Sequence, residues 1–383
     1  MVLYDSYLGT KTSQDIYLRS VEGITLDILY EDEDLIAINK PHGLLVHKTS
    51  MAKDATEFAL QILRDAERYL DPCLDSISQQ SYKDWELLVV DDHSTDRTAE
   101  MMSLWADRDP RIRPVQVQGR GIIHGLRSGY AMARGDFITR MDGDDKMSHD
   151  KLETLLSMLQ HKGRGHVAVG SVAYFSEETL GDGYKSYAAW LNQLTRTSSN
   201  FDEIYKECVI PSPCWMMHQE DFDVCGGFER DRYPEDYDLV FRMKKYGMKV
   251  IGTEKILHHW RDHAYRTSRH DPHYSDNTFL DIKVHYFIED DRVRSMPLVL
   301  WGAGKKGKAL ATRLNETKAT YKWITRNENK IGKEIYGIRL LPQESLREMP
   351  PSQVIIMISS PDDRAEVAHI ISTLPQHRFY PWM

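Results

Sequence analysis

The 383-residue sequence has few cysteines, no surplus of positive charge and no long hydrophobic run. No C-x-x-C pair occurs among the four cysteines, which argues against a zinc site or a disulfide framework. The net charge of −9 argues against a nucleic-acid scaffold, and we expect no nucleic-acid partner. No apolar stretch is long enough to cross a bilayer, and the start lacks a secretory signal pattern. We therefore expect a cytoplasmic protein with reduced thiols, either free or peripheral at the inner face of the membrane.

The remaining composition is that of a globular protein, with 41% hydrophobic and 28% charged residues. A chain of this length can form two or three domains with sizeable cores. Changes in the pattern of apolar residues divide it at about residues 65 and 295. We therefore predict three domains: 1–65, 66–295 and 296–383.

The first domain begins with two short apolar runs, 26–30 and 35–38, on either side of an acidic turn, which predicts two strands. Asp54 followed by Glu57 is an N-cap signature for a helix with regularly spaced apolar residues. Pro72 interrupts this spacing, and a proline is tolerated if a second helix begins near residues 68–71. The proline therefore marks a junction.

The second domain alternates strands and helices. Apolar runs predict strands at 85–90, 113–117 and 137–141, and helical spacing predicts helices at 98–105 and 121–133. Such alternation favours an α/β fold with a mostly parallel sheet, whose ligands bind at the carboxyl ends of the strands. Polar residues stand at two such ends: Asp91 and Asp92 after the first strand, and Asp142 and Asp144 after the third.

The Asp142 and Asp144 pair is the most informative motif. Two carboxylates one residue apart at a strand end can share one divalent cation. Their hard oxygen atoms suit Mg²⁺ or Mn²⁺, which commonly bridges to phosphate oxygens. The alternative is a purely structural turn, because aspartate and glycine both favour turns.

Several ordered stretches resemble the inverting glycosyltransferases of family 2, which have the GT-A fold. The matching stretches are residues 66–70, 76–80, 89–96, 133–138 and 140–145, followed by Phe228, 234–238 and 260–263. The resemblance covers about 66–295. It implies a GT-A fold and a transferase that takes a sugar from a nucleotide-diphosphate donor.

The resemblance also implies roles for single residues. By position, Asp92 would hold the donor nucleobase and Asp142 its ribose or diphosphate. Asp144 would be the principal ligand of Mn²⁺ or Mg²⁺, with His263 as an additional metal or diphosphate contact. Asp236 would be the general base. The implied reaction moves a sugar from a nucleotide-diphosphate donor, expected to be uridine-linked, to a hydroxyl of a glycan or lipid-linked acceptor.

Ordinary structural roles compete with these assignments. Asp236, with Glu235 before it, is also typical of a helix N-terminus, where acidic residues are favoured. His263 can be a packed or surface histidine, as can its neighbours 258–259. Asp91 is expected to support a turn, and Asp145 and Asp96 to be a turn residue and a helix cap.

Three arginines are further candidates for contacts with the diphosphate. Arg127 lies in the helix that precedes the Asp142 strand and could face the diphosphate. Arg266 and Arg269 form a basic patch beside His263. Solvated arginines are the commoner case for all three.

The chain departs from the family at its start. Members begin with a strand and loop of the type Val-Ile-Ile-Pro-x-Tyr-Asn, which is absent here. Residues 24–64 instead resemble the amino-terminal part of the RluA-type pseudouridine synthases, most closely over 28–47. The Arg-Leu-Asp motif of that family occurs nowhere in this chain, so we reject pseudouridine synthesis. Either residues 24–40 replace the missing strand, with 35–38 as the best candidate, or the chain is a non-catalytic chimaera with a weakened donor site.

The third domain begins with a buried-type strand, 298–301, that runs into Gly302, Gly304 and Gly307 and then a helix. This context predicts a Rossmann-like unit. A dinucleotide site would place an acidic residue about twenty positions on, at the end of the next strand. Thr325 and Arg326 stand there instead, with Glu328 nearby, so a structural or partner-binding module is favoured. Lys305, Lys306 and Arg326 could still hold an anion.

Overall fold

The structure is a computed structural model. It describes residues 67–176, 181–263, 279–358 and 360–383, and by backbone alone residues 2–5, 19–21, 24–31 and 35–39. The helix predicted after Asp54 and Glu57 lies outside the described residues, as do Arg266 and Arg269.

The N-terminal strands form a sheet of their own. Its order is β1-β4-β3-β2 and its pairs are antiparallel. The strands are β1 (Val2–Asp5), β2 (Arg19–Val21), β3 (Ile24–Glu31) and β4 (Leu35–Asn39). The two predicted strands are thus confirmed, but the prediction that 24–40 would join the transferase sheet is wrong. Only residues 32–34 separate β3 from β4, and so short a connection favours pairing as a hairpin.

The next unit pairs two parallel strands, β5 (Leu87–Asp91) and β6 (Ile112–Gln116), with helices α1 (Glu67–Ser78) and α2 (Thr98–Arg108). Helix α1 buries Leu70, Cys73, Leu74 and Ile77 against this unit. It begins at Glu67, one residue before the predicted start, and Pro72 lies inside it. Pro72 is the sixth residue of this helix, beyond the four N-terminal positions whose amides lack a helical partner, so it removes one helical hydrogen bond.

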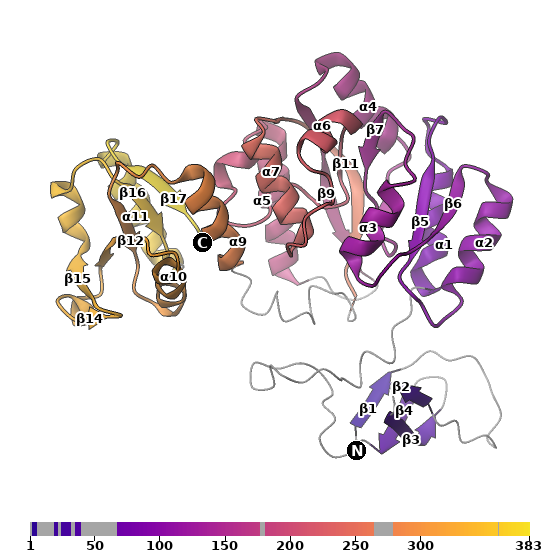
Figure 1. Cartoon of the computed structure of the whole chain (residues 1–383), viewed down its shortest axis with the longest axis horizontal. Coiled ribbons are helices and arrows are strands. Elements are labelled where there is room, and N and C mark those ends of the chain that lie inside the picture. The colour runs from indigo at the N-terminus through magenta and orange to yellow at the C-terminus, as the bar shows by residue number, and fades with distance from the viewer. Residues whose placement is uncertain are drawn as a thin grey trace.

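A five-stranded mixed sheet forms the centre of the molecule (Figure 1). Its order is β7-β10-β9-β11-β8, with β7 (Phe137–Thr139), β8 (Lys146–Met147), β9 (His166–Phe175), β10 (Trp215–His218) and β11 (Lys249–Arg261). Only β9 and β11 pair in parallel, and the other three pairs are antiparallel. A mostly parallel sheet was predicted from strand–helix alternation. That rule orders β5 and β6 correctly but not β7, because the sheet neighbour of β7 is β10, which follows much later in the chain.

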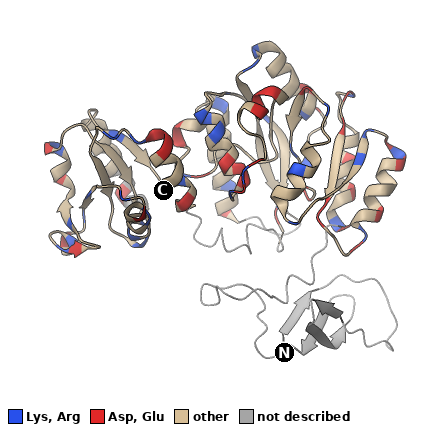
Figure 2. Cartoon of the chain, viewed as in Figure 1, with Lys and Arg blue, Asp and Glu red and all other residues tan. Residues whose placement is uncertain are grey.

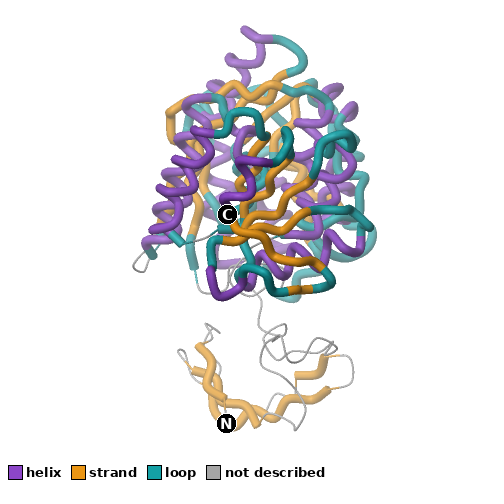
Figure 3. Tube along the Cα trace, turned by 90° about the vertical axis from the view of Figure 1, so that its left-hand side faces the viewer, coloured by secondary structure: helices purple, strands orange, loops and turns teal. Residues whose placement is uncertain are grey.

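Helices cover the central sheet. They are α3 (Ile122–Tyr130), α4 (Lys151–Lys162), α5 (Asp182–Thr197), α6 (Gln219–Val224) and α7 (Glu235–Lys245), with a 3-10 turn at Asn200–Glu203. Figure 3 shows strands with helices on both sides. Charged positions of both signs are interspersed along these elements (Figure 2). All four cysteines lie in the described part of the chain, where they are buried and free. Among the described residues, no helix is both long and apolar enough to span a membrane.

The C-terminal sheet has the order β14-β15-β13-β12-β16-β17 and is parallel except at its β14 edge. Its strands are β12 (Leu298–Trp301), β13 (Lys322–Thr325), β14 (Glu334–Ile335), β15 (Ile338–Pro342), β16 (Gln353–Ile356) and β17 (Arg378–Pro381). Helices α10 (Lys305–Glu316) and α11 (Pro361–Thr373) and a 3-10 turn at Gln343–Glu348 complete it. The predicted strand and helix after Met296 are therefore confirmed.

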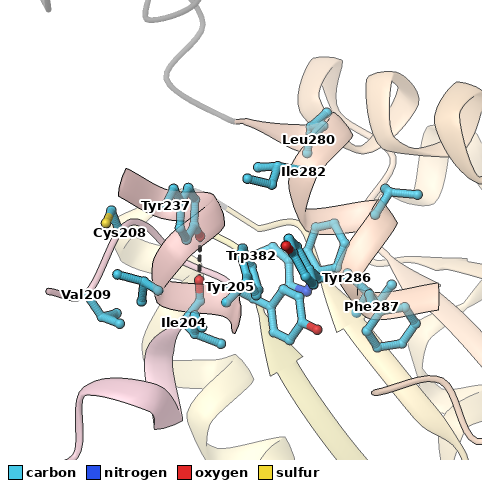
Figure 4. Close-up of a cluster of buried hydrophobic side chains, with 14 of the residues drawn as sticks. Ile204, Tyr205, Cys208, Val209, Tyr237, Leu280, Ile282, Tyr286, Phe287 and Trp382 are labelled. Atoms are coloured by element: carbon cyan, nitrogen blue, oxygen red, sulfur yellow. Dashed lines mark hydrogen bonds between the residues drawn. The ribbon is translucent and has the colours of Figure 1, made fainter. Parts of the chain in front are cut away.

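A shared aromatic cluster joins this unit to the central one (Figure 4). Helix α9 (Leu280–Tyr286) continues into a π-helical turn, Phe287–Asp291, and leads into the C-terminal sheet. Tyr205 stacks on Trp382, with ring centroids 5.1 Å apart, and Phe241 of α7 stacks on Tyr286 at 4.5 Å. The C-terminal unit thus packs on the core that supports α7.

Candidate functional site

The structure has one large cavity among its described residues, of about 1760 Å³. Its lining includes the ends of β5 and β7 and the start of α7: Asp92, Asp142, Asp144, Glu235 and Asp236. Ligand sites usually measure about 300–1,000 Å³. The excess has a structural cause, because β5 and β7 both contribute lining residues without pairing with each other. Among the described strands, β5 pairs only with β6 and β7 only with β10.

The end of β5 is a well-braced turn. The carboxylate of Asp91 accepts a hydrogen bond from the backbone N–H of Ser94 at 3.1 Å, as predicted for a turn-supporting residue. Asp96 accepts from the N–H of Thr98 and from that of Glu67, both at 3.0 Å, so it caps α2 and also holds the start of α1. These bonds fix the loop that carries the exposed Asp92.

Asp92 faces the cavity from this loop. Its Oδ2 accepts a hydrogen bond from the N–H of Gly121 at 2.8 Å, at the residue before α3. Gly121 has φ 93°, a conformation that glycine adopts without strain. One carboxylate oxygen of Asp92 therefore joins two loops.

The predicted metal residues come together. His263 Nε2 lies 3.0 Å from Asp144 Oδ2, although 119 residues separate them in the chain. The ring of His263 packs on Tyr69 of α1, with centroids 4.8 Å apart. His263 is therefore both packed and beside the carboxylate, so the two alternatives from sequence are compatible.

The ligand atoms of Asp144 and His263 fit a divalent cation that also binds a substrate. Asp144 and His263 offer one oxygen and one nitrogen, and no described group of three or more acidic, histidine or cysteine side chains forms a complete cation site. The Nδ1 atom of His263 is buried and has no hydrogen-bond partner in the described part of the chain. Mg²⁺ and similar ions commonly bind through one or two protein ligands and complete their shell with phosphates and water.

Asp236 lies in the first turn of α7, as the helix-start interpretation expected. The same residue lines the cavity. Burial, followed by the negative charge of Glu235, raises the pKa of Asp236 to about 7 against the lowering effect of Arg140. A carboxylate with a pKa near neutrality can gain and lose a proton at the pH of the cell.

Arg140 is the site residue that the sequence interpretation missed. Its guanidinium binds Glu235 Oε1 at 2.7 Å and Asp142 Oδ1 at 3.1 Å, so it joins the β7 end to the start of α7. Burial alone would lower the pKa of Arg140, but Asp142, Glu235 and Asp236 raise it overall, so the group stays charged. The signal in the sequence that could have identified Arg140 is its position two residues before Asp142.

Arg127 has a different place from the one considered. Its Nε donates to the carbonyl of Phe228 at 2.8 Å, and its guanidinium pairs with Asp231 at 2.7 Å. These bonds tie α3 to the loop before α7, and Arg127 is not among the residues that line the cavity. A contact between Arg127 and a diphosphate stays a prediction without support from this geometry.

Two carbonyls of the glycine loop in the C-terminal sheet accept hydrogen bonds from the protein's own side chains. Trp323 Nε1 donates to the carbonyl of Gly302 at 2.9 Å, and Lys330 Nζ donates to that of Ala303 at 2.7 Å. Arg326 pairs with Asp363 and, at 2.8 Å, with Glu366. Of the three cations predicted to hold an anion, Arg326 is therefore already partnered, and for Lys305 and Lys306 anion binding stays a prediction.

Comparisons with known proteins agree with this architecture. Residues 62–226 match Glycosyl transferase family 2. EpsE of Bacillus subtilis, a glycosyltransferase by its name, is 36% identical over 222 residues, which span 56% of this chain and 77% of EpsE. Glycosyltransferase GlyA of Streptococcus pneumoniae is 33% identical over 226 residues, 51% of this chain but 31% of GlyA. This chain thus spans about a third of the length of GlyA.

A solved structure is similar at a lower level. It is the mannosyltransferase PcManGT of Pyrobaculum calidifontis in complex with GDP-Man and Mn²⁺, with a TM-score of 0.40 and 17% identity over 65% of this chain and 61% of that one. The fold class predicted from sequence, an α/β fold of the GT-A type with mixed sheets flanked by helices, is confirmed. The match to EpsE and the family match together show that this chain belongs to glycosyltransferase family 2.

Proposed function

We propose that this chain is a metal-assisted, inverting glycosyltransferase. It would move a sugar from a nucleotide-diphosphate donor, expected to be UDP-linked, to a hydroxyl of a glycan or lipid-linked acceptor. The observation that carries the proposal is the meeting of Asp92, Asp144 and Asp236 on one cavity, from three elements far apart in the chain. The proposed domains are 1–65, 66–295 for the transferase, and 296–383, with a Rossmann-like C-terminal unit.

Donor binding would use the two strand ends. Asp92 would accept hydrogen bonds from the nucleobase, and Asp142 from the ribose. Arg140 keeps Asp142 in place through its 3.1 Å contact and also supplies a buried positive charge near the diphosphate. A divalent cation held by Asp144 and His263 would stabilise the charge that develops on the leaving diphosphate.

Asp236 would act as the general base. Inversion requires the acceptor hydroxyl to attack the anomeric carbon from the face opposite the leaving group, and the hydroxyl proton must go to a nearby base. Asp236 lines the cavity with a pKa raised to about 7, and Arg140 binds Glu235 beside it. Such proton transfer contributes about 10²–10⁴-fold to the rate.

Two alternatives have weaker support. A pseudouridine synthase would need the Arg-Leu-Asp motif, which the sequence lacks. A non-catalytic chimaera is consistent with the separate N-terminal sheet and with the lack of pairing between β5 and β7 among the described strands. It predicts a folded protein that binds no donor.

Calorimetric titration with UDP, GDP and dTDP, each with and without Mn²⁺, distinguishes these functions. The transferase proposal expects metal-dependent binding of one nucleotide, which also identifies the donor class. Asp144→Ala should abolish the metal dependence. Asp202→Asn, an exposed acidic residue remote from the cavity lining, should not change it. A folded protein that binds none of the three nucleotides would support the chimaera.

A further inference from the structure

We propose that Lys151 and His258 are positioning residues for the metal site: they hold the 142–145 turn in place through Asp145. This inference rests on the proposed metal-assisted transfer. None of the three residues was expected to act in this way, since Asp145 was interpreted as a turn residue and His258 as an ordinary histidine.

The three side chains form a buried row behind the turn. Lys151, His258 and Asp145 are 0%, 0% and 2% exposed. Lys151 Nζ donates to the carbonyl of Pro213 at 2.5 Å and lies 3.4 Å from His258 Nδ1. His258 Nε2 in turn lies 2.9 Å from Asp145 Oδ2. With the ammonium donating to Nδ1, the imidazole carries its proton on Nε2 and donates to the carboxylate.

Asp145 connects the three buried side chains to the residues that would hold the cation. Its Oδ1 accepts from the N–H of Arg261 at 2.7 Å, and the Nε of Arg261 donates to the carbonyl of Asp144 at 2.8 Å. The N–H of Asp145 donates to the carbonyl of Asp142 at 3.3 Å. The backbone of the turn is thus anchored, while the carboxylates of Asp142 and Asp144 remain about 30% exposed, at 30% and 31%.

The buried lysine has a positioning role besides a stabilising one. An apolar side chain of equal length would leave the carbonyl of Pro213 and Nδ1 of His258 without this donor, so Lys151 also adds stability. What such a side chain cannot do is donate to His258 and so fix the orientation of its ring. Groups behind a metal ligand typically change metal affinity by about 10–100-fold when they are lost.

The test is Lys151→Met, which keeps the length of the side chain but removes its donors. Calorimetric titration of Mn²⁺ in the presence of saturating nucleotide should show affinity weakened by about 10–100-fold, with metal-free nucleotide binding unchanged. Lys162→Met, at the exposed end of the same helix, is the matched control and should bind Mn²⁺ as the unaltered protein does. Equal Mn²⁺ affinity in Lys151→Met and the unaltered protein would overturn the proposal.

Two further measurements keep the inference independent of the proposed function. Asp145→Asn preserves shape if Lys151→Met fails to fold, and it should also weaken Mn²⁺ binding. The double variant should be less impaired than the sum of both effects, because both remove the same support. Hydrogen exchange of the amides in 142–147, measured without metal, should be faster in either variant. If the unaltered protein binds no metal or nucleotide, the proposed function fails, and unchanged exchange would then separately overturn the positioning role.

Discussion

Two regions of this molecule carry polar motifs at the carboxyl ends of strands, and only one of them opens onto a cavity. In the transferase domain, the ends of β5 and β7 present Asp92, Asp142 and Asp144 to a space of about 1760 Å³. In the C-terminal unit, no residue of the glycine loop after β12 lines that cavity. Trp323 and Lys330 take two loop carbonyls, and Arg326 is paired with two carboxylates.

This difference shows what a sequence motif needs in order to form a ligand-binding site. Both regions have the expected strand, turn and following polar residues. In the C-terminal unit two loop carbonyls and Arg326 find partners in neighbouring elements, and strands β12 and β16 are fully buried. At β5 and β7 every strand residue is only partly buried, so a ligand can gain contacts that the protein does not already make. The two regions therefore differ in the contacts that their strand ends can still offer a ligand, and not in the sequence of their motifs.

Asp236→Asn should have the largest effect on the open site. The amide cannot accept the acceptor proton, so kcat should fall by about 10²–10⁴-fold. Nucleotide and Mn²⁺ affinity should stay unchanged, because Asp236 is not placed at the strand ends. Steady-state kinetics with calorimetry would measure both. Asp202→Asn is the control, and full activity in Asp236→Asn would assign the base to another residue.

The pH dependence of the same site should follow the raised pKa of Asp236. The base is active when ionised, so kcat/KM should rise with pH and level off above about pH 7. Relative to the plateau, kcat/KM at pH 5 should be about 100-fold lower, because the ionised fraction falls about tenfold for each unit below the pKa. A profile that is flat across pH 7 would contradict the assignment.

The stability of the folded chain should change in the opposite direction. The pKa of Asp236 is higher in the folded state than its ordinary value of 3.8, so the folded state holds this proton more tightly. Its contribution to the free energy of unfolding is therefore present at low pH and is lost as pH rises toward about 7. Asp236→Asn removes this dependence, and at pH 8 the variant should melt no lower than the unaltered protein.

Gly307→Ala tests the glycine loop of the C-terminal unit. An alanine Cβ at Gly307 would lie 2.2 Å from the carbonyl oxygen of Gly302, so the helix must move away from the loop. Overpacking of this kind costs about 1–3 kcal/mol of stability. Gly304→Ala, where a Cβ meets nothing within 4 Å, is the matched control. Thermal unfolding should separate the two, with donor affinity unchanged in both if the C-terminal loop has no part in the reaction.

The sequence predicted the elements of this fold better than their arrangement. Strand and helix positions from 85 to 141 follow from apolar spacing, because that spacing reports which face of each element is buried. The pairing of β7 with β10 and of β4 with β1 does not follow from it, since sheet neighbours distant in the chain leave no mark on local periodicity. For this reason the prediction that part of 24–40 replaces the missing family strand was wrong, since β3 and β4 lie in a separate sheet.

The site shows the same limit. Asp144 and Asp236 were named because the family resemblance marks them, and His263 was brought to Asp144 by β11 as that resemblance implied. Arg140 and Lys151 were missed, because an arginine just after a strand and a lysine at the start of a helix look like ordinary surface residues in the sequence. Only their burial, 10% and 0% exposed, and their partners reveal that they support the site.

Arg326→Ala should have the smallest effect and sharpens the comparison most directly. Arg326 is 37% exposed and pairs with Asp363 and Glu366, which are 30% and 44% exposed. Exposed ion pairs contribute about 0–1 kcal/mol, so the melting temperature should fall only slightly. Because the guanidinium is already partnered, inorganic phosphate should stabilise the unaltered protein no more than it stabilises Arg326→Ala. The control is Arg347→Ala, an exposed arginine in the same unit. Phosphate stabilisation that disappears only in Arg326→Ala would show that the C-terminal loop is a second open site, and the contrast between the two strand-end regions would then be one of degree.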